Sequence, residues 1–301
     1  MIDLHTHTTA SDGALSPKKL VKKTKEIGLL AIAVTDHDQV AGIPEALKAG
    51  KEYGVEVIPG VELSTYWLGE NRKEFHILGY FIDWQAPNLL EKLDFFQKER
   101  EKRARKSLKI LNDLGYQADW ENLRQIAKGS IGKPHIARVV MENSQNESLL
   151  KKTFITIPTM SEFIQKYMIP GKPAYVEKSG FDPKQAIVLI KEAGGVPILA
   201  HPCFDVPIGD LETVKTLMEW GIEGLEAIAP FKTPEQTRLT IEYFSKVAQD
   251  FNLIATGGSD YHGLDGIGAG LGLFEWGMKI EDEVLNKLKL THENLNYKSS
   301  G

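Results

Sequence analysis

The first stretch of the chain, Met1-Ile-Asp-Leu-His-Thr-His7, has the alternation of a β-strand that carries reactive side chains. Successive side chains of a strand point to opposite faces, so Asp3, His5 and His7 share one face. Two imidazoles on one face can converge on a metal ion, while Asp3 can support them from the second shell. A polar edge strand would show the same alternation, so this stretch alone leaves both interpretations open.

The rest of the sequence indicates an α/β fold. Short apolar runs predict strands at residues 1–7, 30–35, 55–61, 75–82, 196–200, 222–228 and 253–257. Amphipathic stretches predict helices between most of them, at about residues 17–28, 40–53, 182–193, 209–219 and 233–250. Alternation of strand and helix predicts mostly parallel strands with helices on the outside.

Residues 85–173 interrupt this alternation. They contain helical patterns and no convincing strand, with helices expected at residues 89–114, 119–128, 133–142 and 159–167. We therefore expect a helical insertion, or lid subdomain, at 85–173. It would divide a catalytic barrel into residues 1–84 and 174–290, and the tail at 291–301 looks poorly ordered.

Composition limits the possible functions. The net charge of −5 and pI ≈ 6.0 give no general attraction to polyanions, so long nucleic acid is not an expected partner. The longest apolar run, Leu29 to Val34, is too short to cross a membrane, and Met1 leads into a strand without a basic leader, so we expect a cytoplasmic protein. Cys203 is the single cysteine, so any metal must be bound by nitrogen and oxygen. No obligate protein partner is evident.

Further histidines and carboxylates follow the ends of the other expected strands. Parallel α/β folds gather such side chains at one rim, where the carboxyl ends of the strands meet. The candidate metal ligands are His5, His7, Asp12, His37, Glu62, His76, His201, Asp260 and His262. Burial of this set without metal would leave polar groups unpaired at a cost of about 1–3 kcal/mol each. Metal ions therefore explain the set better than a structural role does.

The order and spacing of these motifs resemble the PHP (polymerase and histidinol phosphatase) family. The motifs are Asp3-x-His5-x-His7 with Asp12, Thr35-Asp36-His37, Gly60-x-Glu62, His76, His201-Pro202 and Ser259-Asp260-x-His262. The resemblance implies a distorted seven-stranded (β/α)7 barrel that binds two or three divalent ions, either Zn²⁺, Mn²⁺ or Fe²⁺. It implies one ion on His5, His7, Glu62 and Asp260, a second on Glu62, His76 and His201, and a third on Asp12, His37 and His262. Some members have histidine where Asp12 stands, which leaves the affinity and metal preference of the third site open.

A site of this kind suits the hydrolysis of phosphate esters. Two ions about 3.5–4 Å apart, bridged by Glu62, can lower the pKa of a shared water toward ~7 and direct hydroxide at phosphorus. Electrostatic stabilisation of the phosphoryl oxygens then needs no covalent nucleophile. The residues expected to carry the chemistry are Asp12, His37, Glu62, His201 and His262. The sequence has no nucleophile elbow, glycine-rich phosphate loop or dinucleotide fingerprint, so we expect no organic cofactor.

The segment Gly132-Lys133-Pro134-His135-Ile-Ala-Arg138 opens a helix in the expected insertion. A helix start with cationic side chains suits a phosphate group, although a capped helix with a solvated face would show the same pattern. The segment also resembles a stretch of PHP phosphoesterases that act on nucleotides, which implies that Lys133, His135 and Arg138 bind substrate. The basic run from Lys98 to Lys106 predicts a solvated helix face, or a surface that steers short anionic substrates.

The sequence thus predicts a metal-dependent phosphoesterase that acts on nucleotides. The expected substrates are nucleoside 3′,5′-bisphosphates or short 5′-phosphorylated oligonucleotides, cleaved as monoesters or diesters by a bisphosphate phosphatase or a 5′-to-3′ exonuclease. A histidinol-phosphate phosphatase would share the metal site and is the first alternative, although it would not need the cationic insertion. A non-catalytic nucleotide- or metal-binding module is the second alternative, and the complete ligand set argues against it.

Overall fold

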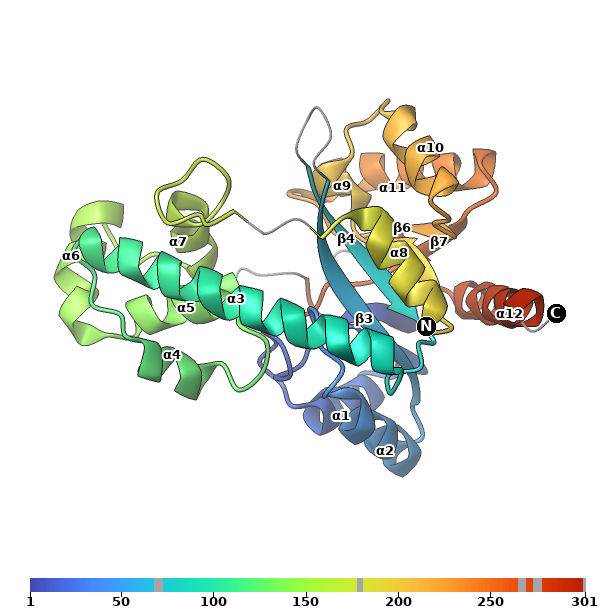
Figure 1. Ribbon diagram of the computed structural model, residues 1–301, viewed down its shortest axis with the longest axis horizontal. Coiled ribbons are helices and arrows are strands. Elements are labelled where there is room, and N and C mark those ends of the chain that lie inside the picture. The colour runs from blue at the N-terminus through green and yellow to red at the C-terminus, as the bar shows by residue number, and fades with distance from the viewer. Residues whose placement is uncertain (68–72, 178–180, 265–268, 273–277, 300–301) are drawn as a thin grey trace.

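Seven strands form one sheet in the computed structural model, which describes residues 1–67, 73–177, 181–264, 269–272 and 278–299 (Figure 1). The strands are β1 (Ile2–Thr6), β2 (Ala31–Val34), β3 (Glu56–Trp67), β4 (Lys73–Tyr80), β5 (Val196–Leu199), β6 (Gly224–Ile228) and β7 (Ile254–Gly257). Neighbours in the chain are neighbours in the sheet, and every adjacent pair is parallel except β3–β4 and β4–β5. The prediction of mostly parallel strands is therefore confirmed.

The two edges of the sheet approach one another. Thr6 of β1 forms a parallel bridge with Tyr261, which follows β7, and the His7 backbone N–H donates to the Tyr261 carbonyl at 2.9 Å. The α/β class is confirmed, and this contact gives the sheet the curvature expected of a distorted seven-stranded barrel. It also places the first and last strands side by side at the rim where the candidate ligands gather.

Helices cover the outside of the sheet. They are α1 (Pro17–Glu26), α2 (Ile43–Tyr53), α8 (Pro183–Glu192), α9 (Pro202–Asp205), α10 (Leu211–Glu219), α11 (Pro234–Asp250) and α12 (Asp282–Ser299). Several begin with a proline after a side-chain cap; in α1, Ser16 accepts a hydrogen bond from the Lys19 N–H. None of the helices among the described residues is long and apolar enough to cross a membrane.

Five α-helices and the short 3-10 helix η1 (Ser144–Asn146) occupy the expected insertion. Most of them gather at one end of the molecule, and the longest runs from there across the front of the sheet (Figure 1, left). The α-helices are α3 (Pro87–Asp113), α4 (Trp120–Ile126), α5 (Lys133–Met141), α6 (Glu147–Phe154) and α7 (Met160–Tyr167). These helices bury a hydrophobic cluster of their own, which includes Leu111, Tyr116 and Phe163. The start of α3 packs through Leu89 and Leu93 on the cluster beside the sheet. The division of the chain into barrel and insertion stays a prediction, which the separate clusters favour.

The expectation of a poorly ordered tail after residue 290 is wrong for residues 291–299. These residues continue α12, which begins at Asp282. Leu285 and Leu288 are buried with residues of β1 and β5, and Leu295 packs against the same cluster. Leucines three and seven residues apart lie on one face of a helix, as Leu285, Leu288 and Leu295 do. This apolar face extends into the expected tail and could have predicted that the helix continues there.

Candidate metal centre

The nine predicted ligands converge on one rim of the sheet. The ring centroids of neighbouring histidines in this group lie 4.1–6.0 Å apart. The histidines come from β1, the end of β2, β4 and the segments after β5 and β7. Because most of these strands are parallel, their carboxyl ends share this rim, and the lengthened β3 and β4 carry Glu62 and His76 to it.

Glu62 lies at the centre of the group and is fully buried. Its carboxylate oxygens lie 2.8–3.3 Å from imidazole nitrogens of His5, His7, His37, His76 and His201. Five imidazoles around one carboxylate exceed the about four hydrogen bonds that its oxygens can accept. This arrangement is typical of a carboxylate that bridges metal ions bound by the surrounding histidines.

Three sets of side chains hold potential ligand atoms within 4.8 Å of one another. The sets are His5, His7, Glu62 and Asp260; His37, Glu62 and His76; and His7, Asp12, His37 and His262. The first equals the set expected for one ion, and the third is the expected third set with His7 added. His201 lies 3.1 Å from Glu62 without joining the second set, where His37 takes its place.

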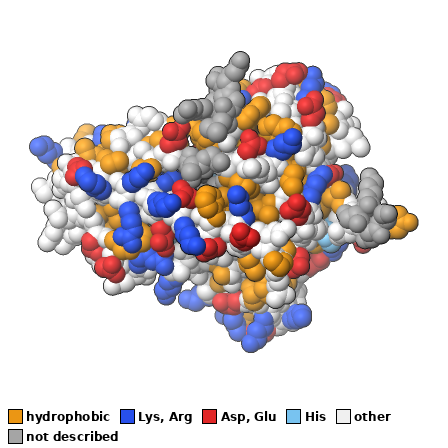
Figure 2. All heavy atoms as spheres, viewed as in Figure 1, with side chains coloured by type: hydrophobic (Ala, Val, Ile, Leu, Met, Phe, Trp, Pro, Cys, Tyr) orange, Lys and Arg blue, Asp and Glu red, His pale blue; other side chains and the backbone are white. Residues whose placement is uncertain are grey.

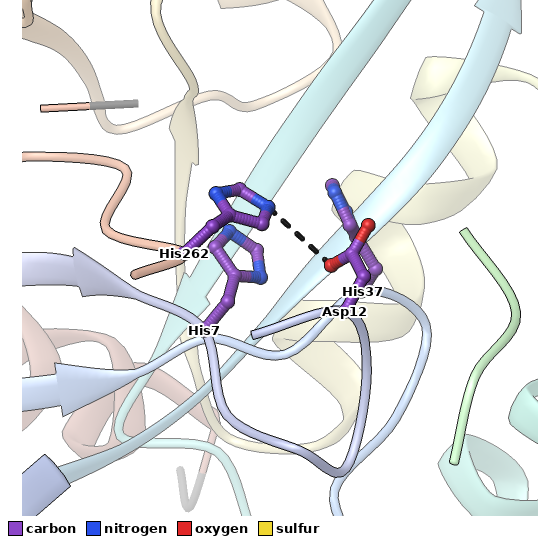
Figure 3. A group of neighbouring side chains, drawn as sticks. All are labelled: His7, Asp12, His37 and His262. Atoms are coloured by element: carbon purple, nitrogen blue, oxygen red, sulfur yellow. Dashed lines mark ion pairs between the residues drawn. The ribbon is translucent and has the colours of Figure 1, made fainter. Parts of the chain in front are cut away.

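Figure 3 shows the third set, whose four side chains point toward one another from separate segments. His7 and His37 follow β1 and β2, while Asp12 comes from the loop after β1. His262 comes from the segment after β7, and its Nε2 lies 3.3 Å from Asp12 Oδ1. One nitrogen or oxygen from each side chain is thus available to a single ion.

Several buried ligand atoms form no hydrogen bond among the described residues, although some lie within ion-pair distance of one another. They are His5 Nε2, Asp12 Oδ1, His37 Nδ1, Glu62 Oε2 and His201 Nδ1. A buried polar atom without a hydrogen bond costs about 1–3 kcal/mol, so five of them in one cluster need an explanation. Imidazole nitrogens and carboxylate oxygens fit zinc, manganese and iron, and ligation would satisfy these atoms.

The carboxylates outweigh burial and raise the pKa of three of the histidines, His5, His201 and His262. Burial alone would lower the pKa of His201, but the hydrogen bond and negative charge of Glu62 outweigh burial and raise the pKa to about 9. Burial opposes the same change at His262, where the charges of Asp12 and Asp260 raise the pKa to about 9. Without metal, both charged imidazoles stabilise the fold below their unfolded pKa of about 6.5, and this contribution is lost as pH rises through about 9.

Metal binding should therefore release protons near neutral pH. A histidine must be neutral to bind a metal ion, so His5, His201 and His262 should each lose a proton when Zn²⁺ or Mn²⁺ enters at about pH 7.5. We expect about three protons released per chain and an affinity that rises up to about pH 9. Titration calorimetry in buffers of different ionisation enthalpy measures the number, and no release at this pH would contradict the raised pKa values.

Comparisons with known proteins agree with this geometry. The family model described as "PHP domain" matches residues 3–167. The chain belongs to the PHP domain family. A PHP relative from Haemophilus influenzae named 5′-3′ exoribonuclease is 32% identical over 86% of this chain and 89% of its own. A 3′,5′-nucleoside bisphosphate phosphatase from Chromobacterium violaceum is 28% identical over 87% of each chain.

A solved structure shares the whole PHP architecture. It comes from Bifidobacterium adolescentis, is provisionally described as a metal-dependent phosphoesterase, and has a TM-score of 0.80 with 26% identity over 95% of this chain and 94% of its own. Relatives and structure together identify this PHP protein as a metal-dependent phosphoesterase.

Glu226 of β6 supports the PHP metal centre and was missed by the sequence analysis. Both of its carboxylate oxygens lie 3.0 Å from His5 Nδ1, and one accepts the His201 backbone N–H at 2.7 Å. A carboxylate on the outer nitrogen fixes the ring so that Nε2 faces the centre. The available signal was a single acidic residue within the buried apolar strand Gly224–Ile228.

Asp3 supports the PHP centre differently from the expectation. Its carboxylate accepts hydrogen bonds from the Ser259 N–H and hydroxyl and from the Gly272 N–H. It also accepts the His5 backbone N–H at 3.3 Å. Asp3 therefore fixes the segment after β7 against β1, and so positions the backbone that carries the ligands.

A cavity of about 370 Å³ lies where the metal centre meets the insertion. Asp12, His37 and His76 line it together with Arg100, Arg103 and Lys133. The volume lies within the range of small-molecule sites. A ligand in this cavity would touch the metal centre and cationic side chains at the same time.

A second cavity of about 320 Å³ shares Asp12 and Pro134 with the first and is lined by His135 and Arg138. The structure therefore does not bring the three predicted substrate-binding residues into one cavity, because Lys133 lines the first. His135 Nδ1 accepts the Gly132 N–H at 3.1 Å. Arg138 is half exposed and pairs with Glu142 at 2.7 Å.

The basic run on α3 has two kinds of residue. Lys98 and Lys102 are exposed and pair with Asp94 and Glu99, which gives the solvated mixed-charge face that the sequence predicts. Figure 2 shows lysine and arginine side chains interspersed with acidic ones over this part of the molecule. Arg100 and Arg103, in contrast, face the first cavity.

Proposed function

We propose that the protein hydrolyses phosphate monoesters or diesters of nucleotides. The proposed substrates are nucleoside 3′,5′-bisphosphates and short 5′-phosphorylated oligonucleotides. The observation that carries the proposal is the cavity lined both by candidate metal ligands and by Arg103 and Lys133. Cationic side chains beside a metal centre suit a molecule with more than one phosphate. The names of two relatives, an exoribonuclease and a bisphosphate phosphatase, favour nucleotides.

We propose two or three divalent ions, zinc, manganese or iron, and no organic cofactor. One ion would lie on His5, His7, Glu62 and Asp260, a second on Glu62, His76 and His201, and a third on Asp12, His37 and His262. The proximity of these side chains supports the assignment, and His37 lies close enough to join the second set. When bound, the ions would supply an activated water and positive charge for the phosphoryl oxygens.

The side chains of the chain itself would position the reacting groups. Glu62 would bind two ions and fix their positions relative to one another, and Glu226 would fix the orientation of the His5 ring. His135 and Arg138 would bind a phosphate oxygen from the second cavity, and Lys133 would do so from the first. Cytoplasmic location and the absence of an obligate protein partner stay predictions of the sequence.

A comparison of substrates tests the proposal. With Mn²⁺ or Zn²⁺ present, we expect kcat/KM for adenosine 3′,5′-bisphosphate or a 5′-phosphorylated dinucleotide to exceed that for histidinol phosphate by roughly 10–100-fold. This factor corresponds to the about 1.5–3 kcal/mol that a hydrogen bond to a charged group contributes, because only the nucleotides carry a second phosphate.

The two alternatives give different results in the same experiment. A higher kcat/KM for histidinol phosphate would identify a histidinol-phosphate phosphatase. Binding of metal without hydrolysis of any of these substrates would identify a non-catalytic binding module. Either outcome would contradict the proposed function.

A further inference from the structure

Two arginines line the first cavity, and their hydrogen bonds differ. Arg100 is buried, and its three nitrogens donate to Asp38 at 2.7 Å, the Ser64 hydroxyl at 2.9 Å and the Ile131 carbonyl at 3.1 Å. Its guanidinium is therefore committed to the protein. Arg103 Nε is also buried but has no hydrogen-bond partner among the described residues.

A buried guanidinium nitrogen without an acceptor favours an anion nearby. Arg103 lies one turn from Arg100 on the same helix, and both line the cavity that reaches Asp12 and His37. Burial, and next the positive charge of Arg100, lower the pKa of Arg103 to about 10. An anionic ligand would relieve both effects, because it would supply the missing acceptor and the opposite charge.

The position of Arg103 indicates which anion it would bind. The metal ligands that line the same cavity account for the phosphate that reacts, so Arg103 is available for a different anionic group of the same molecule. Lys133 also lines this cavity and provides a second cation. Arginine binds phosphate oxygens in a bidentate manner, and lysine adds a point charge.

We propose that Arg103, assisted by Lys133, binds the non-scissile phosphate of a substrate with two phosphates, and so determines specificity for bisphosphorylated nucleotides. This inference rests on the proposed nucleotide phosphoesterase function. It assigns the second phosphate to the first cavity, between α3 and the metal centre, rather than to the cavity of His135 and Arg138.

Kinetics of Arg103→Gln and Arg103→Lys test the inference. For adenosine 3′,5′-bisphosphate we expect Arg103→Gln to lower kcat/KM by roughly 10–100-fold, and Arg103→Lys to lower it much less. Hydrolysis of p-nitrophenyl phosphate, which has one phosphate, should change by less than about 3-fold. The matched control is Arg105→Gln, which removes an exposed arginine of the same helix that stacks on Trp120.

Four outcomes would overturn the inference. Equal loss on both substrates would place Arg103 at the reacting phosphate, and loss on neither would remove it from the site. Loss of bisphosphate preference in Arg138→Ala, with Arg103→Gln unchanged, would place the second phosphate in the other cavity. An equal loss in Arg105→Gln would show that the effect comes from the helix surface.

Binding to the metal-free protein separates this inference from the proposed function. Wild-type protein should bind adenosine 3′,5′-bisphosphate more tightly than adenosine, which has no phosphate, in calorimetry, and Arg103→Gln should remove most of the difference. If wild-type protein hydrolyses no phosphate ester, the proposed function is wrong, while the binding comparison still decides the role of Arg103. If it is active and the variant keeps the full binding difference, only the inference fails.

Discussion

Replacement of Glu62 by alanine should remove bound metal and lower kcat/KM by at least about 10³-fold. The carboxylate lies within 3.3 Å of five imidazoles, so its loss leaves the ions that it bridges without their shared ligand. Metal ions contribute several kcal/mol of charge stabilisation in the transition state, and a loss of about 4 kcal/mol corresponds to this factor. Metal content per chain and kcat/KM should fall together.

Asp12→Ala is the matched control for this variant. Asp12 belongs only to the set with His7, His37 and His262, so its removal should weaken one ion and keep the others. Glu62→Ala protein that kept wild-type metal content and turnover would contradict the proposed centre. An unchanged circular dichroism spectrum would show that the Glu62→Ala variant is folded.

Replacement of Arg100 by methionine should lower the free energy of unfolding by about 3–5 kcal/mol. Loss of one partner of a buried ion pair leaves the other charge, here that of Asp38, without compensation. The pair also joins α3 to the segment after β2, one residue after His37, so some loss of metal affinity should accompany the loss of stability. Urea denaturation of the metal-free protein measures the change.

Arg103→Met serves as the matched control for stability. This arginine lies one turn away and has no hydrogen-bond partner at Nε, so its replacement should cost much less. In a double-mutant cycle, addition of Asp38→Asn to Arg100→Met should restore most of the free energy of unfolding that Arg100→Met removes. A loss below about 1 kcal/mol in Arg100→Met would show that the pair contributes little to stability.

The sequence predicted the strands and ligands well, because both depend on local patterns. Apolar runs identify β1, β2 and β5–β7 within about two residues, and the histidines follow the strand ends. The reversal of β4 was not predictable, because strand direction depends on pairing with distant residues. The role of Glu226 depends on its distance from His5, which lies 221 residues away in the chain.

The two kinds of arginine on α3 were partly predictable. Leu93, Phe96, Arg100, Ala104 and Ser107 recur at spacings of three and four, which places Arg100 on the buried stripe of the helix. Because many lysines and arginines surround Arg100, the sequence analysis did not recognise that this residue belongs to the buried face. Pairing of Arg100 with Asp38, and the lack of a partner for Arg103, depend on the packing of the insertion against β2 and could be found only in three dimensions.

The meeting of the first and last strands ties assembly of the centre to the completion of folding. His7 and Asp260 lie 3.0 Å apart but 253 residues apart in the chain. A loop of this length closes at a large entropic cost, and contacts of such high contact order form slowly. A growing chain therefore presents His5 and His7 long before Asp260 and His262 exist. The full ligand set arises only when the barrel closes, so tight metal uptake should report the final step of folding.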